Sequence, residues 1–170
     1  MHPNAELIER FYTAFKHRDA AGMVACYHPQ VEFSDPVFPN LKGPRARAMW
    51  KMLCERGKDL EIEFEGIEAD DTSGRAHWRA FYTFTATGRP VENRIYARFV
   101  FEDGRIIRHR DSFDLWRWSA QALGLKGRLL GWTPLMREAI RRQAARSLDA
   151  FIRQHEESAT AEPAEVTAAR

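Results

Sequence analysis

The chain has 170 residues, 44% hydrophobic and 12% aromatic, which is enough to bury one substantial core and indicates a single main domain. Its 26 basic and 24 acidic side chains leave a formal net charge of +2, which gives no indication of a nucleic-acid partner. Cys26 and Cys54 form no CxxC motif, which favours free thiols in a reducing compartment over a disulfide.

Neither a secretory signal nor a membrane span is indicated. Residues 1–6 contain no basic segment followed by an apolar run. No stretch approaches the ~18 consecutive apolar residues of a membrane-spanning helix. We therefore expect a cytoplasmic protein without a membrane partner.

The first part of the chain predicts two helices, a short strand and a third helix. Apolar residues at spacings of three and four indicate a helix over 4–17 that Asn4 can cap. Asp19 can cap a short second helix, which ends at His28-Pro29. A strand over 31–35 and a proline-containing loop over 36–43 follow, and Pro44 suits the first turn of a helix over 44–57.

Residues 60–114 alternate between apolar and polar side chains, which indicates strands. We expect strands over 60–67, 75–87 and 91–101, with turns at 70–74 and 88–90. Asp103-Gly104 then turns the chain into a fourth strand, because Asp-Gly readily adopts the positive backbone angles that a tight hairpin needs. Helices that precede an antiparallel meander predict an α+β fold.

The last part of the chain predicts a loop and one long helix. Gly124, Gly127 and Gly131 indicate a loop after at most one helical turn at 119–124, and Thr133-Pro134 begins a helix that runs to about His155. From 156 onward Ser, Thr, Ala, Glu and Pro predominate, which predicts a disordered tail. We therefore divide the chain into a main domain over 1–118, a C-terminal loop and amphipathic helix over 119–155, and a tail over 156–170.

An acid and an imidazole share one face of the fourth strand. Alternation with a period of two places four residues on that face: Ile107, His109, Asp111 and Phe113. If this face is the inner one, Asp111 lies in apolar surroundings that favour acid–base chemistry, and His109 could shuttle a proton beside it. The alternative is a structural carboxylate that pairs with His109.

The opposite face of the predicted sheet is charged. Glutamates lie on the first of the four strands and arginines on the others, with Phe81 and Tyr96 among them: Glu61, Glu63, Glu65, Arg79, Arg94, Arg98, Arg108 and Arg110. One interpretation is a solvated face with weak cross-strand ion pairs. We favour a homodimer through this face. The C-terminal helix offers a competing interface, or a cover for the same face.

Four segments carry a resemblance to a known family: 14–23, 33–37, 43–47 and 103–114. With the order of the elements, they make the chain resemble the nuclear transport factor 2-like superfamily, the cone-shaped, cystatin-like fold of ketosteroid isomerase, limonene epoxide hydrolase and SnoaL-like polyketide cyclases. The resemblance covers roughly 4–118. It implies a curved, mostly antiparallel sheet wrapped around three N-terminal helices, with the C-terminal helix as an addition.

The resemblance to the isomerase is incomplete at its catalytic positions. Asp35 takes the position of the isomerase's general base. Phe11 and Ala97 stand where the isomerase has the two acids that hold the enolate oxygen, which argues against steroid isomerase chemistry.

The resemblance to the epoxide hydrolases and cyclases favours one residue. Asp111 takes the position of their catalytic aspartate on the last strand. The hydrolases also need an arginine paired with a second carboxylate. Arg79 is a candidate for that arginine, but Phe81 stands where the acid is expected.

We therefore expect a small-molecule pocket protein, and specifically an acid–base enzyme of cyclase, isomerase or hydrolase type that acts on an apolar substrate. The expected catalytic residues are Asp111, Asp35 and His109. The expected ligand-pocket residues are Phe11, Tyr12, Phe15, Met52, Trp78, Tyr82, Phe99 and Phe113. No cofactor or metal is implied, because the six histidines lack ligand spacing and no glycine-rich phosphate loop is present.

Simpler roles exist for each of these residues. The aromatic side chains could only pack the core, and Asp35 before Pro36 could only stabilise a turn. The alternative function is therefore a non-catalytic ligand-binding or dimerisation domain of the same fold. A cavity of several hundred Å3 would favour the enzyme or a ligand binder.

Overall fold

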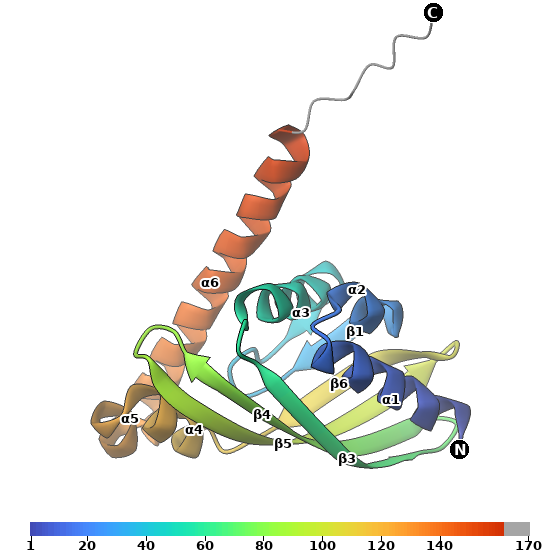
Figure 1. The fold of residues 1–170 in the computed structure, drawn as a ribbon, viewed down its shortest axis with the longest axis horizontal. Helices are drawn as coiled ribbons and strands as arrows, with labels where there is room; N and C mark the ends of the chain where they lie inside the picture. Colours follow the sequence, from blue (N-terminus) through green and yellow to red (C-terminus); the bar gives the residue numbers. More distant parts are fainter. Residues whose placement is uncertain (162–170) are drawn as a thin grey trace, which may run out of the picture.

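A computed structural model describes residues 1–161 of the chain (Figure 1). The elements follow in the order α1 (Pro3–Lys16), α2 (Ala20–Ala25), β1 (Tyr27–Ser34), β2 (Leu41–Lys42), α3 (Pro44–Arg56), β3 (Glu61–Ala69), β4 (Ser73–Phe84), β5 (Arg89–Glu102), β6 (Arg105–Ser112), α4 (Leu115–Leu123), α5 (Leu125–Leu130) and α6 (Pro134–Ala161). The strands form one sheet in the order β2-β1-β6-β5-β4-β3. β1 is parallel to β6, and all other neighbours are antiparallel. The predicted α+β fold is confirmed.

Helices α1, α2 and α3 lie over one face of the curved sheet (Figure 1). The apolar positions of α1 recur every three or four residues and are all buried: Leu7, Ile8, Phe11, Tyr12 and Phe15. They pack against the inner side chains of the sheet to form the main core. Inner and outer faces are thus fixed by the same alternation that the sequence displays.

The predicted alternation holds along β4 and most of β6. Ala76, Trp78 and Ala80 are buried, whereas Arg75 and Arg79 are exposed. Near the start of β6 the register with β5 shifts between Val100 and Phe101. This irregularity puts Ile106 in the core at 0% exposure, and Ile107 is only partly buried. The expectation that Ile107 shares the inner face with Asp111 is therefore wrong, because an extra residue at a bulge reverses the side that follows.

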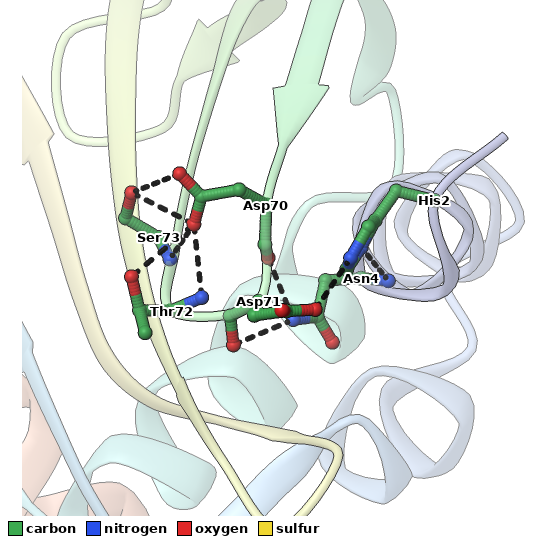
Figure 2. Close-up of polar contacts among 6 residues, drawn as sticks. All are labelled: His2, Asn4, Asp70, Asp71, Thr72 and Ser73. Atoms are coloured by element: carbon green, nitrogen blue, oxygen red, sulfur yellow. Dashed lines mark hydrogen bonds and ion pairs between the residues drawn. The ribbon is translucent and has the colours of Figure 1, made fainter.

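The start of α1 is fixed by the turn between β3 and β4 (Figure 2). The N-cap is His2, whose Nδ1 accepts from the Asn4 N–H at 3.1 Å, and not Asn4 as the sequence suggested. The Asn4 amide instead donates to the carbonyl oxygens of Asp70 and Asp71 at 2.9 and 3.3 Å. Asp70 Oδ1 accepts the backbone N–H groups of its own turn, so the turn is rigid where the helix docks.

The C-terminal third differs from its prediction. The single turn expected at 119–124 is part of the longer helix α4, and the loop expected after it contains the helix α5. The expected domain boundary at 118 falls inside α4. Leu115 and Trp118 of α4 form a second small core with Val91 of β5. These residues make α4 part of the wall of the main domain.

Helix α6 packs beside α3 and does not cover the outer face of the sheet (Figure 1). Leu148 and Phe151 are buried, and Arg45 pairs with Asp149 at 2.8 Å. The helix continues beyond the expected end near His155 to Ala161. The remainder of the predicted disordered tail, 162–170, lies outside the described residues.

Candidate functional site

A cavity of about 280 Å3 lies between the inner face of the sheet and the helices α3 and α4. This volume is close to the lower end of the usual range for small-molecule pockets, roughly 300–1,000 Å3. Five of the eight expected pocket residues line it: Phe15, Met52, Trp78, Tyr82 and Phe113. Other lining residues were not anticipated, among them Val37, Phe38, Leu53, Ile95 and Trp118.

Three expected pocket residues belong to the packed core instead. Phe11 and Tyr12 are 0% exposed and Phe99 is 2% exposed, and none of the three lines the cavity. Their rings meet one another edge to face, and Phe11 and Phe99 also contact the ring of His109, edge to face and at a tilt respectively. Sequence parity gives the face on which a side chain lies, but only packing decides whether it borders empty space.

Asp111 and His109 are joined in a buried chain of hydrogen bonds. His109 Nε2 lies 2.9 Å from Asp111 Oδ1, and Trp78 Nε1 donates to the same oxygen at 3.4 Å. On its other side, His109 Nδ1 lies 2.7 Å from the hydroxyl of Tyr27. Trp50 Nε1 donates to that hydroxyl at 2.7 Å. No described residue bonds Asp111 Oδ2.

The direction of this chain fixes the position of the histidine proton. An indole N–H only donates, so the oxygen of Tyr27 accepts from Trp50 and its hydroxyl hydrogen is free to point at His109 Nδ1. Nδ1 then accepts, and Nε2 carries the proton and donates it to Asp111. With this tautomer, both ring nitrogens of His109, the Tyr27 hydroxyl and the Trp50 N–H all have hydrogen-bond partners.

His109 does not line the cavity. It is 0% exposed and surrounded by aromatic rings, so the expected proton shuttle has no direct access to a ligand. The histidine instead orients the Asp111 carboxylate, which does line the cavity. The contribution of Tyr27 and Trp50 was missed because their hydrogen bonds join residues that are far apart in the sequence.

Asp35 lies at the cavity wall just beyond the end of β1. Its Oδ1 accepts the backbone N–H groups of Val37 and Phe38 at 2.7 and 2.6 Å, so the expected turn-stabilising role is real. Burial nevertheless raises the pKa of Asp35 to about 7, and the nearby charge of Asp111 adds to the rise. The two backbone hydrogen bonds act in the opposite direction and are outweighed.

Tyr82 adds a neutral hydrogen-bond donor to the cavity. The oxygen of Tyr82 accepts from Trp118 Nε1 at 2.6 Å, which leaves the Tyr82 hydroxyl hydrogen free for another acceptor. Burial raises the pKa of Tyr82, so this hydroxyl keeps its proton at neutral pH. Two carboxyl groups that are not exposed to solvent, those of Asp35 and Asp111, and the Tyr82 hydroxyl therefore border a largely apolar cavity. Its other polar lining residues are Asn93, which is partly buried, and the exposed residues Arg56, Asp59, Thr83 and Thr85.

Other candidate features lie elsewhere. Arg79 is on the outer face, where it pairs with Glu63, and so it does not reach the cavity. Among residues 1–161, no group of three or more His, Cys, Asp or Glu side chains is placed to hold a metal ion. No helix within the same range is long and apolar enough to cross a membrane.

A comparison with protein-family models identifies the family of this chain. The family model described as SnoaL-like domain matches residues 8–109. The chain belongs to the SnoaL-like domain family. The match covers α1 to most of β6 and ends at His109, so Asp111 and the C-terminal helices lie beyond it. A search of curated proteins found no match.

Solved structures share the fold at low sequence identity. A putative SnoaL-like polyketide cyclase from Jannaschia sp. CCS1 is 18% identical over 70% of this chain and 90% of its own, with a TM-score of 0.61. A putative polyketide cyclase from Xanthomonas campestris is 24% identical over 70% and 96%, at 0.58. An epoxide hydrolase of the limonene type from M. tuberculosis is 19% identical over 76% and 96%, also at 0.58. At such identities the likeness concerns the fold.

Proposed function

We propose that this SnoaL-like protein is a cofactor-free acid–base enzyme of cyclase, isomerase or hydrolase type that acts on a small apolar molecule. The observation that carries the proposal is the pair of carboxyl groups in one apolar cavity, with Asp35 at a pKa of about 7. A group with this pKa holds and releases a proton with similar ease at neutral pH, which suits general acid–base catalysis.

The two carboxyl groups have different surroundings and therefore different roles. His109 and Trp78 donate to one oxygen of Asp111 and leave Oδ2 for the ligand. Asp111 Oδ2 takes a proton from the substrate, Asp35 supplies one to another atom of it, and the Tyr82 hydroxyl hydrogen-bonds a substrate oxygen. His109 is a positioning residue, because it acts on the substrate only through Asp111.

The first experiment is native mass spectrometry of the protein purified from its own host, to detect and identify a retained apolar ligand. The second follows deuterium from D2O and 18O from labelled water into that ligand, because proton abstraction from carbon by an isomerase or cyclase leaves the first label and hydrolysis leaves the second. We expect the change Asp111→Asn to lower the incorporation rate about 100-fold or more while the ligand still binds. Asp103→Asn is the matched control, because Asp103 is an exposed turn residue.

The results separate the enzyme from its alternative. Wild-type protein that retains a ligand but incorporates neither label is a non-catalytic binding domain. Incorporation that survives both Asp111→Asn and Asp35→Asn contradicts the assignment of these two carboxyl groups. A ligand-free protein that incorporates neither label into any of a set of small apolar ketones and epoxides also contradicts the enzyme, and favours a dimerisation domain.

We also infer a homodimer in the cytoplasm, formed through the outer face of the sheet. This face has a hollow of about 730 Å3. Three arginines that line it lie directly opposite one another on neighbouring strands: Arg75 on β4, Arg98 on β5 and Arg110 on β6. Like charges directly opposite one another destabilise a sheet, and glutamates of a second copy would relieve this. The free, buried thiols of Cys26 and Cys54 agree with a reducing compartment. Sedimentation velocity tests the dimer, and a wild-type monomer at high micromolar concentration contradicts it.

A further inference from the structure

One end of the molecule exposes large apolar side chains. They lie on α4, on α5 and at the start of α6, which gather together beyond the edge of the sheet (Figure 1). The side chains and their exposures are Trp116 46%, Leu125 70%, Leu129 60%, Leu130 46%, Trp132 58% and Leu135 84%. We call these six residues the apolar end. Apart from Met1 and Val100, they account for the exposed large hydrophobic residues of the described chain.

The exposure follows from how α5 packs, and not from loose attachment. A Cβ atom at Gly127 would lie 1.9 Å from the Ser119 carbonyl oxygen, and one at Gly131 would lie 1.9 Å from Ser119 Oγ. Only glycine allows this close approach to α4. The helix therefore buries its glycines and presents its leucines to the outside, which is the reverse of an ordinary amphipathic helix.

Hydrogen bonds hold the two tryptophan rings against the same helix. Trp116 Nε1 donates to the carbonyl oxygen of Arg128 at 2.9 Å, and Trp132 Nε1 donates to that of Leu129 at 3.0 Å. Both indole rings are thus held against α5. Large apolar side chains that are exposed together on neighbouring elements, and not singly over the surface, mark interaction sites.

The segment that carries the apolar end has basic charges only. Residues 115–137 contain Arg117, Lys126, Arg128 and Arg137 and no Asp or Glu, and the nearest acidic residues in the sequence, Asp114 and Glu138, flank this segment. Arg117, Lys126 and Arg128 are exposed, and no acidic side chain within residues 1–161 pairs with them. An apolar surface whose own segment carries only unpaired basic charges fits an anionic partner.

We propose that the apolar end docks on the surface of a bilayer that contains anionic phospholipid. Tryptophan and leucine partition into the interfacial region, and neighbouring lysine and arginine bind the headgroups. A second copy is a poorer partner, because two-fold pairing of this surface with itself would place like charges opposite one another. Surface docking needs no helix that could span a membrane, and residues 1–161 contain none. The proposal departs from the expectation of no membrane partner, which considered spanning segments only.

Vesicle co-sedimentation of the full chain tests the proposal. We expect strong binding to vesicles of equimolar phosphatidylcholine and phosphatidylglycerol, weak binding to phosphatidylcholine alone, and loss of binding as salt rises. The double variant Leu125→Ala with Leu129→Ala, and separately Lys126→Glu with Arg128→Glu, should each lower partitioning about tenfold or more. All four side chains are exposed, so circular dichroism should stay that of the wild type.

The matched controls are Val100→Ala for an exposed apolar residue elsewhere and Arg153→Glu for an exposed charge elsewhere; both should bind as the wild type does. Equal binding to the two vesicle types, or no binding, overturns the proposal. So does sedimentation velocity in which the leucine variant dissociates an oligomer, because a second copy then occupies the surface. Vesicle binding is read out without any substrate, so it fails or succeeds independently of the proposed catalysis.

Discussion

The change Asp35→Asn should make the protein more stable at neutral and alkaline pH. The ordinary pKa of an aspartate, 3.8, is raised in the folded protein to about 7. Between those two values the folded state binds the proton and the unfolded state does not. The free energy of unfolding therefore falls as the pH rises through this window, and it stays low above pH 7.

The magnitude follows from the same two values. Each pKa unit corresponds to ~1.4 kcal/mol, so the interval from 3.8 to about 7 amounts to a loss on the order of 4 kcal/mol when complete. Because the free energy of unfolding follows the difference in bound protons between the folded and unfolded states, ~2–3 kcal/mol of that loss falls between pH 5 and pH 8. Asparagine keeps an oxygen that can accept the N–H groups of Val37 and Phe38 and carries no charge to bury. The variant should lack this pH-dependent loss.

Urea unfolding of wild type and Asp35→Asn at pH 5 and pH 8 measures the effect. We expect the free energy of unfolding of the variant, relative to that of the wild type, to be ~2–3 kcal/mol higher at pH 8 than at pH 5. Asp103→Asn, at an exposed hairpin position with a φ of 52° that asparagine tolerates, should follow the wild type. If Asp35→Asn follows the wild type within ~0.5 kcal/mol at both pH values, the carboxyl is not buried as the structure has it, and the acid–base assignment loses its basis.

Two further predictions concern the hydrogen-bond chain and the core. Tyr27→Phe leaves Trp50 Nε1 and His109 Nδ1 buried without the hydroxyl that joins them, so the free energy of unfolding should fall by ~1–3 kcal/mol. 15N NMR should show that the His109 ring loses its single tautomer. An unchanged tautomer contradicts the assigned direction of the hydrogen bonds. Phe11→Ala should destabilise by ~3–5 kcal/mol, because Phe11 is fully buried. Phe113→Ala should cost clearly less in urea unfolding, because this partly exposed ring borders a cavity; equal losses contradict the division between core and pocket.

Periodicity was sufficient to predict most of the fold. The period-two pattern of residues 60–114 assigned Trp78, His109 and Asp111 to the inner face, since a strand turns successive side chains to opposite sides. It failed at Ile107, where one bulged residue reverses the side. It also missed α4 and α5, because glycine signals a loop as readily as it permits the close helix contact made by Gly127.

The site was harder to predict than the fold. Strand parity and the family resemblance indicated Asp111, and the resemblance indicated Asp35. The role of Tyr27 depends on contacts with His109 and Trp50, which lie 82 and 23 residues away. No local pattern encodes such contacts. Nor does parity distinguish Phe99, which fills the core, from Phe113, which borders the cavity. That distinction depends on how the facing helices pack.

The chemistry of position 35 bears on whether the site is functional. A turn that needs only an acceptor for the N–H groups of Val37 and Phe38 is served as well by asparagine as by aspartate. Aspartate at this place adds a charge that burial and Asp111 both disfavour, and so it lowers stability at neutral pH. Residues that oppose stability in this way are concentrated at active sites, where the ionisable group itself is used. The turn explains why an acceptor stands at position 35, whereas proton transfer explains why it is an acid.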